Sequence, residues 1–183
     1  PSWELYIADP EPKNYGGKIY VYGSLDVENG ILENEIDWCS DRYRVIYSDD
    51  MYHWTDAGIS FHLDWISDKY KSKKVTRLWA PDVLKHPNNG KYYLYSCFNH
   101  SDNKYNMMVS SGDSPEGPFR NPAPLMIDGK KPISQIDPAV LVDDDDKAYV
   151  TWPFKIGQLD PDDYTKVLGN TVVDLRPWMP ENN

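Results

Sequence analysis

The sequence predicts an all-β fold, because short segments of alternating apolar and polar residues are separated by clusters of turn-forming residues. The alternating segments are residues 18–22, 43–47, 91–95, 107–109 and 147–152. Turn residues gather at 15–17, 87–90 and 143–146, where glycine, proline, asparagine and aspartate favour chain reversal. No window keeps a helical spacing of apolar residues for three turns, so we expect few helices.

Three of the predicted strands begin in the same way, which indicates an internal repeat. Each follows a turn and starts with lysine, any residue and tyrosine: Lys18–Tyr20, Lys91–Tyr93 and Lys147–Tyr149. Each is preceded, nine to eleven residues earlier, by an acidic segment that contains proline: Ala8–Pro10, Ala80–Asp82 and Ile136–Pro138. The three lysines are 73 and 56 residues apart, near the roughly 40–50 residues of a propeller blade once loops are inserted.

We therefore predict that residues 1–183 form part of a single β-propeller domain, with blades at about 5–60, 78–122 and 134–175. The chain is long enough for one domain with its own core. Blades arranged around an axis would bring the three acidic segments together, which suggests a site. A β-sandwich or lectin-like fold would also explain the strands, but it gives no reason for a repeated acidic segment.

The charge balance argues against two classes of partner. The chain has 29 acidic and 19 basic side chains, for a net charge of −10, and its longest basic cluster is the short stretch Lys69–Lys74. We therefore expect no nucleic-acid partner. No apolar run approaches the roughly 18 residues of a membrane span, so we expect no membrane partner. No signal peptide is visible and there is no initiator methionine, which leaves the compartment open.

The cysteines and the aromatic residues each leave two interpretations open. Cys39 and Cys97 lack metal-binding or redox spacing, so one disulfide or two buried thiols fit equally well. Tryptophan and tyrosine, 7 and 14 in number, far outnumber the 4 phenylalanines. Amphipathic rings suit a saccharide-binding cleft, but half-buried strands also favour tyrosine.

Four segments, in this order along the chain, resemble glycoside hydrolase family 43. They are residues 6–10, residues 78–83, residues 109–119 with the core Ser114–Pro118, and residues 136–145. The resemblance covers nearly the whole chain and implies a five-bladed β-propeller, of which about three blades are present. It also implies inverting hydrolysis of arabinose- or xylose-containing oligo- or polysaccharides, of the β-xylosidase or α-L-arabinofuranosidase type.

The resemblance places the general base at Asp9 and the pKa modulator at Asp137. The carboxyl groups of an inverting pair are about 6.5–9.5 Å apart, which admits the attacking water. A neighbouring carboxylate raises the pKa of the general acid by like-charge repulsion, and this is the effect expected of Asp137. Asp82 shares the repeat, but its Pro-Asp order is reversed, so we expect a structural role.

The general-acid glutamate of the family is absent from its expected place after the third blade. Glu116 precedes Gly-Pro as the family acid does, but it belongs to the closing motif of the second blade. Glu181 is two residues from the end, with no strand after it to hold it. We therefore expect a fragment of a longer enzyme, inactive alone, or a chain completed by other blades or by self-association. The alternative is a non-catalytic carbohydrate-binding propeller or an inert fragment.

Six residues are candidates for contact with the saccharide. Trp79 resembles the family's tryptophan before Ala-Pro and is the candidate stacking platform. The others follow the tyrosine strands of the three blades: Ser24, Asp26, Phe98, Asn99 and Trp152. Ordinary packing is the alternative for each of them. Arabinose or xylose specificity, and exo or endo attack, both stay open.

No cofactor is required by this chemistry, and the sequence contains no metal-ligating motif. The acidic run Asp143–Asp146 lacks the alternating spacing of a calcium loop. A hairpin turn is favoured there, with Asp146 in the left-handed position where glycine is usual. Some relatives hold an axial calcium or sodium ion, partly through a histidine of a later blade. The four histidines here form no ligand motif, so such a site would be incomplete.

Overall fold

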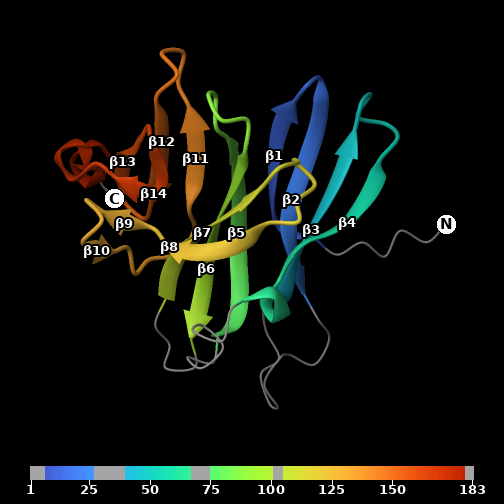
Figure 1. Cartoon of the computed structure of the whole chain (residues 1–183), viewed down its shortest axis with the longest axis horizontal. Coiled ribbons are helices and arrows are strands. Elements are labelled where there is room, and N and C mark those ends of the chain that lie inside the picture. The colour runs from blue at the N-terminus through green and yellow to red at the C-terminus, as the bar shows by residue number, and fades with distance from the viewer. Residues whose placement is uncertain (1–6, 27–39, 67–74, 101–104, 180–183) are drawn as a thin grey trace.

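The computed structural model describes residues 7–26, 40–66, 75–100 and 105–179, which form three β-sheets (Figure 1). The first sheet contains β1 (Ala8–Tyr15), β2 (Lys18–Asp26), β3 (Ser40–Ser48) and β4 (Thr55–His62). The second contains β5 (Val75–Lys85), β6 (Tyr92–His100), β7 (Tyr105–Gly112) and β8 (Arg120–Pro124). The third contains β9 (Met126–Ile127), β10 (Lys131–Pro132), β11 (Ala139–Val142), β12 (Ala148–Trp152), β13 (Lys155–Asp160), β14 (Asp163–Val167) and β15 (Val173–Asp174). The prediction of an all-β fold is confirmed.

The helical elements of the described residues are short 3-10 turns. They are η1 (Leu63–Trp65), η2 (Gly169–Thr171) and η3 (Arg176–Trp178). Within the described part of the chain, no helix combines the length and hydrophobicity needed to cross a membrane.

Strand order follows the chain in the first two sheets. In the first two sheets every neighbouring pair is antiparallel. The β1–β2 loop shows why: Tyr15 pairs with Lys18, and Gly16 and Gly17 have φ values of 63° and 85°, as a two-residue type I′ hairpin requires. In the third sheet, β14 also pairs in parallel with β9, so this sheet begins upstream of residue 134, at Met126.

The first strands of the three sheets lie next to one another. β5 is in contact with both β1 and β11 and lies between them (Figure 1). All three run in the same direction (Figure 1). The residues at their beginnings therefore gather at one end of the molecule, and the turns that follow them gather at the other.

Tyrosine side chains fill the core between the first two sheets and bond across the boundary. The Tyr43 hydroxyl donates to the Trp79 carbonyl oxygen at 3.0 Å, and the Tyr15 hydroxyl donates to the Val83 carbonyl at 2.8 Å. A phenylalanine would fill the same space without these bonds. This core contains Tyr20, Tyr22, Tyr43, Val45, Phe61, Ile66, Leu78, Val83, Tyr92, Leu94, Phe98, Met108 and Phe119. Packing between strands therefore accounts for much of the tyrosine content.

A second core joins the second and third sheets. The Tyr95 hydroxyl donates to the Tyr164 carbonyl at 2.8 Å, and the Tyr164 ring stacks on His86 with centroids 4.2 Å apart. His86 Nδ1 accepts from the Asn88 amide at 3.1 Å, which leaves Nε2 to donate to the Pro161 carbonyl, also at 3.1 Å. The core residues are Leu84, Tyr95, Met107, Val109, Leu125, Ile133, Val140, Ala148, Val150, Trp152, Leu159, Tyr164 and Val167.

The loop between β7 and β8 anchors the second sheet to the first. The Tyr22 hydroxyl donates to the Pro115 carbonyl at 2.7 Å, and the Phe119 amide donates to the Ser60 carbonyl at 2.8 Å. The Phe119 ring is fully buried and meets the Tyr22 ring edge-on, with centroids 6.4 Å apart. The buried Phe119 ring therefore packs between this loop and the first sheet, beside hydrogen bonds that join the two.

We expect Phe119→Ala to lower the free energy of unfolding by about 3–5 kcal/mol, because it leaves a cavity between two sheets. Urea unfolding measures the loss. The matched control is Phe154→Ala, whose side chain is 53% exposed, and its change should stay within about 0.5 kcal/mol. Equal losses in both variants would show that the loop is not anchored in this way.

Candidate active site

A left-handed residue stands before a proline near the start of β1, within β5 and just before β11. Asp9, Ala80 and Asp137 have φ values of 49°, 38° and 53°, and each is followed by proline. This conformation is costly for residues other than glycine, by roughly 1–3 kcal/mol, and such residues concentrate at functional sites. The shared geometry makes these three residues structural equivalents in the three repeats.

The backbone around these residues explains how they are presented. The register of β1 against β2 shifts between Ala8 and Glu11, and that of β5 against β6 shifts between Trp79 and Asp82. Each bulge contains the left-handed residue and its proline, which has no N–H to donate to the ladder. Bulges of this kind turn a side chain out of the regular alternation. Asp9 is accordingly exposed.

The structure brings the charges of Asp9 and Asp137 within reach of each other. Burial raises the pKa of Asp137, and the negative charge of Asp9 raises it further. Burial and then the charge of Asp137 raise the pKa of the Cys97 thiol to about 12. Cys97 is a buried free thiol, whereas Cys39 lies outside the described residues. Two carboxyl groups from the first and third sheets therefore share one electrostatic environment.

Asp82 does not occupy the position equivalent to Asp9 and Asp137, because Ala80 does. The Asp82 side chain is instead buried and forms an ion pair with Lys13. Lys13 was not singled out from the sequence, although the reversed order of Pro81 and Asp82 was the available signal that Asp82 differs from the other two acids.

Trp79, Ser24 and Asp26 lie near the beginnings of the innermost strands. The Trp79 side chain is half-buried, with the Arg77 guanidinium 5.9 Å from its ring centroid. Ser24 is buried and its hydroxyl donates to the Ala8 carbonyl oxygen at 3.3 Å, next to Asp9. Asp26 ends β2, and its side chain lies outside the described part. Trp79 as a stacking platform stays a prediction.

Phe98 and Trp152 belong to the cores, which corrects their expected place in a cleft. Phe98 has no exposed surface and lies against Phe61, with ring centroids 5.8 Å apart. Trp152 is buried in the second core. Neither ring has a free face for a sugar, because the inward positions of their strands face a neighbouring sheet. Asn99, which follows Phe98, is buried as well.

Glu116 is occupied by structural hydrogen bonds. It accepts from the Tyr20 hydroxyl at 3.0 Å and from the Ser114 hydroxyl. Burial favours the protonated form, but the bonds from Ser114, its own amide and Tyr20 outweigh it and lower the pKa of Glu116. A general acid must be protonated at the working pH, so Glu116 does not fit that role. Glu181 lies outside the described residues.

The acidic run 143–146 forms a hairpin turn. The Asp143 amide donates to the Lys147 carbonyl at 2.8 Å, and the Asp146 amide donates to the Asp143 carbonyl at 2.9 Å. Asp146 has a φ of 61°, as expected from its place in the turn. Among the described residues, no three His, Cys, Asp or Glu side chains converge in a group that could hold a metal ion.

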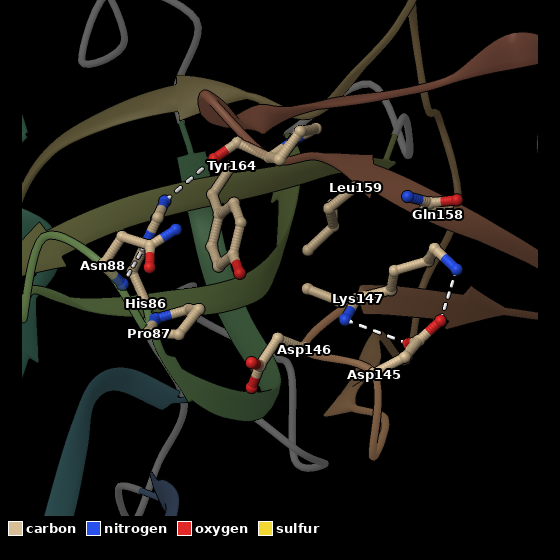
Figure 2. Close-up of a pocket in the computed structure, with 11 residues that line it drawn as sticks. His86, Pro87, Asn88, Asp145, Asp146, Lys147, Gln158, Leu159 and Tyr164 are labelled. Carbon is tan, nitrogen blue, oxygen red and sulfur yellow. Dashed lines mark hydrogen bonds and ion pairs between the residues drawn. The ribbon is translucent and has the colours of Figure 1, made fainter.

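A hollow of about 280 Å³ lies among the turns that follow the innermost strands β5 and β11, away from the segments that contain Asp9 and Asp137. It is formed by the turns after β5, β11 and β13, and Figure 2 shows His86, Tyr164 and Asp146 around it. The His86 and Tyr164 side chains that line it stack on each other at the second core, as described above. The hollow is therefore separate from the paired carboxyl groups.

The sequence matches the family described as "Glycosyl hydrolases family 43" over residues 3–172. A xylosidase/arabinosidase 43A from Humicola insolens is 36% identical over 154 residues, which cover 80% of this chain and 43% of the relative. A xylosidase/arabinosidase from Bacteroides ovatus is 33% identical over 147 residues, which cover 79% and 42%. The chain thus spans less than half the length of these relatives.

Solved structures of the family share the fold. A β-xylosidase/α-arabinofuranosidase from a compost microbial metagenome, solved with xylotriose, superposes with a TM-score of 0.73 at 26% identity, covering 93% of this chain and 59% of that one. A Xanthomonas citri enzyme gives 0.71 at 24% identity, covering 93% and 55%. The predicted propeller-type fold, present in part, is confirmed. The chain belongs to glycosyl hydrolase family 43.

Proposed function

We propose that this chain provides the general base and the pKa modulator of an inverting glycosidase that acts on xylose- or arabinose-containing saccharides. One observation carries the proposal: Asp9 and Asp137 occupy equivalent left-handed positions, and the charge of one raises the pKa of the other. The relatives named for xylosidase and arabinosidase activity support the substrate class.

Each carboxyl group has a distinct role in this mechanism. Asp9 is exposed, so it can accept a proton from water as the water attacks the anomeric carbon. The bond to the leaving oxygen breaks as a general acid delivers a proton to that oxygen. Asp137 adds a negative charge nearby, which favours the protonated form of a neighbouring acid. Because the chain spans less than half of its relatives, we expect that acid from outside these 183 residues.

Asp9→Asn should lower kcat by about 10²–10⁴-fold on 4-nitrophenyl xyloside or arabinofuranoside, the usual contribution of a general base. Asparagine tolerates the left-handed backbone, so binding of the saccharide should persist. Turnover is measured on the protein isolated from its source, and the intact mass of the protein is determined in the same fractions. Asp146→Asn is the matched control, because Asp146 is exposed with a φ of 61° and lies at the other end of the strands.

Two outcomes would overturn this assignment. Full turnover by Asp9→Asn would remove Asp9 from the chemistry. Saccharide binding without turnover by the wild-type protein would favour the alternative function, a non-catalytic carbohydrate-binding propeller.

Asp137→Asn should stabilise the fold near pH 7 while it impairs turnover. The pKa of Asp137 is raised in the folded chain, so the folded state binds its proton more tightly than the unfolded state. Its contribution to stability is complete below the unfolded pKa of about 3.9 and is lost as the pH rises through the folded value. Thermal unfolding measured from the unfolded pKa up to pH 7 should show that the stability of Asp137→Asn, relative to the wild-type protein, increases with pH. A constant difference at every pH would contradict the coupling.

A further inference from the structure

A buried ion cluster connects the innermost strands of all three sheets. Lys13 Nζ on β1 lies 2.9 Å from Asp82 Oδ1 on β5 and donates to the carbonyl oxygen of Val140 on β11, also at 2.9 Å. The Val140 amide donates to Asp82 Oδ2 at 2.6 Å. Glu11 Oε1 is a second acidic neighbour of Lys13, at 3.2 Å. Each of the three strands thus bonds to the other two.

The cluster follows the candidate catalytic carboxylates at short and similar intervals. Lys13 is four residues after Asp9, and Val140 is three residues after Asp137. At about 3.3 Å per residue along a strand, Lys13 and Val140 lie roughly 10–13 Å along the backbone from Asp9 and Asp137, respectively. The cluster is therefore too far away to touch substrate at their position, but close enough to fix where both strands begin.

Burial makes this cluster sensitive to the loss of either charge. The Asp82 side chain is 2% exposed and that of Lys13 is 18% exposed. Burial raises the pKa of Asp82 to about 7, against the opposing effects of Lys13 and the Val140 amide. Removal of one partner from a buried pair leaves an uncompensated charge. Backbone ladders fix the spacing within each sheet, so the spacing between sheets depends on side chains such as these.

We infer that Lys13 and Asp82 are positioning residues that hold Asp9 and Asp137 at a fixed separation. The expected effect on turnover rests on the proposed function. The expected effect on the pKa of Asp137 depends only on geometry, because the separation of the two carboxyl groups sets how strongly the charge of Asp9 acts on the Asp137 proton.

The first test is the pKa of Asp137, measured by ¹³C NMR titration in the wild-type protein and in Lys13→Met. Removal of a positive charge would by itself raise this pKa. A wider gap between Asp9 and Asp137 would lower it. We expect the pKa of Asp137 to be lower in Lys13→Met than in the wild-type protein, and closer to its value in Asp9→Asn. In the double variant, Lys13→Met should not lower this pKa below its value in Asp9→Asn alone. An unchanged or higher pKa in Lys13→Met would overturn the inference.

Lys18→Met is the matched control, because Lys18 pairs with Asp49 at 3.6 Å on the surface. This substitution removes the same charge as Lys13→Met but leaves the ion cluster intact. It should leave the pKa of Asp137 unchanged. If Lys13→Met does not fold, Asp82→Asn keeps the shape and one acceptor oxygen. Loss of the Asp82 charge changes the pKa of Asp137 directly, and this direct change is the same whether or not Asp9 is present. The test is therefore the difference between the Asp137 pKa shift that Asp82→Asn causes in the wild-type protein and the shift that it causes in Asp9→Asn.

Turnover provides the second test. Lys13→Met should lower kcat by about 10–100-fold, as expected for a displacement of the order of 1 Å, with KM changed by less than about twofold. An equal loss in kcat and in saccharide affinity, with the Asp137 pKa intact, would indicate a merely structural role. If no variant turns over but the Asp137 pKa responds as expected, the positioning inference holds and the proposed function fails.

Discussion

The structure depends on a backbone constraint that is repeated once in or beside each innermost strand. A residue in the left-handed region precedes a proline that cannot pair with the neighbouring strand. Asp9 and Asp137 occupy two of these positions and Ala80 occupies the third. The strain at each position is small compared with the packing of two cores, so the fold can sustain it. What the repeat provides is the same backbone conformation for two acids that are far apart in the sequence.

Contacts between the sheets make that arrangement specific. Hydrogen bonds within a sheet fix the register of its own strands, but they do not fix the distance to the next sheet. Tyrosine hydroxyls such as those of Tyr43 and Tyr95 bond across each boundary, and their rings fill the space between. The ion cluster of Lys13, Asp82 and Val140 adds contacts in which a charged side chain joins all three innermost strands.

Local patterns in the sequence were sufficient to predict the strands, and the repeated acidic segments led to the prediction that acids from different sheets come together. The repeated segments before Lys18 and Lys147 contain Asp9 and Asp137, each directly followed by proline, and both residues adopt the left-handed conformation. The same patterns could not show which neighbours a strand would have. Phe98 and Trp152 follow tyrosine strands just as cleft residues would, yet both face an adjacent sheet. Alternation along a strand shows from which face of the sheet a side chain projects. Only tertiary packing decides whether that face is exposed to solvent or covered by another sheet.

The stereochemistry of hydrolysis tests the central claim most directly. With the protein isolated from its source and a β-xyloside as substrate, ¹H NMR can identify the anomer of xylose that forms first. We expect α-xylose, because water activated by Asp9 attacks from the face opposite the leaving group. Initial release of β-xylose would rule out Asp9 as an inverting base, since retention requires a carboxylate nucleophile and carboxyl groups only about 5–5.5 Å apart.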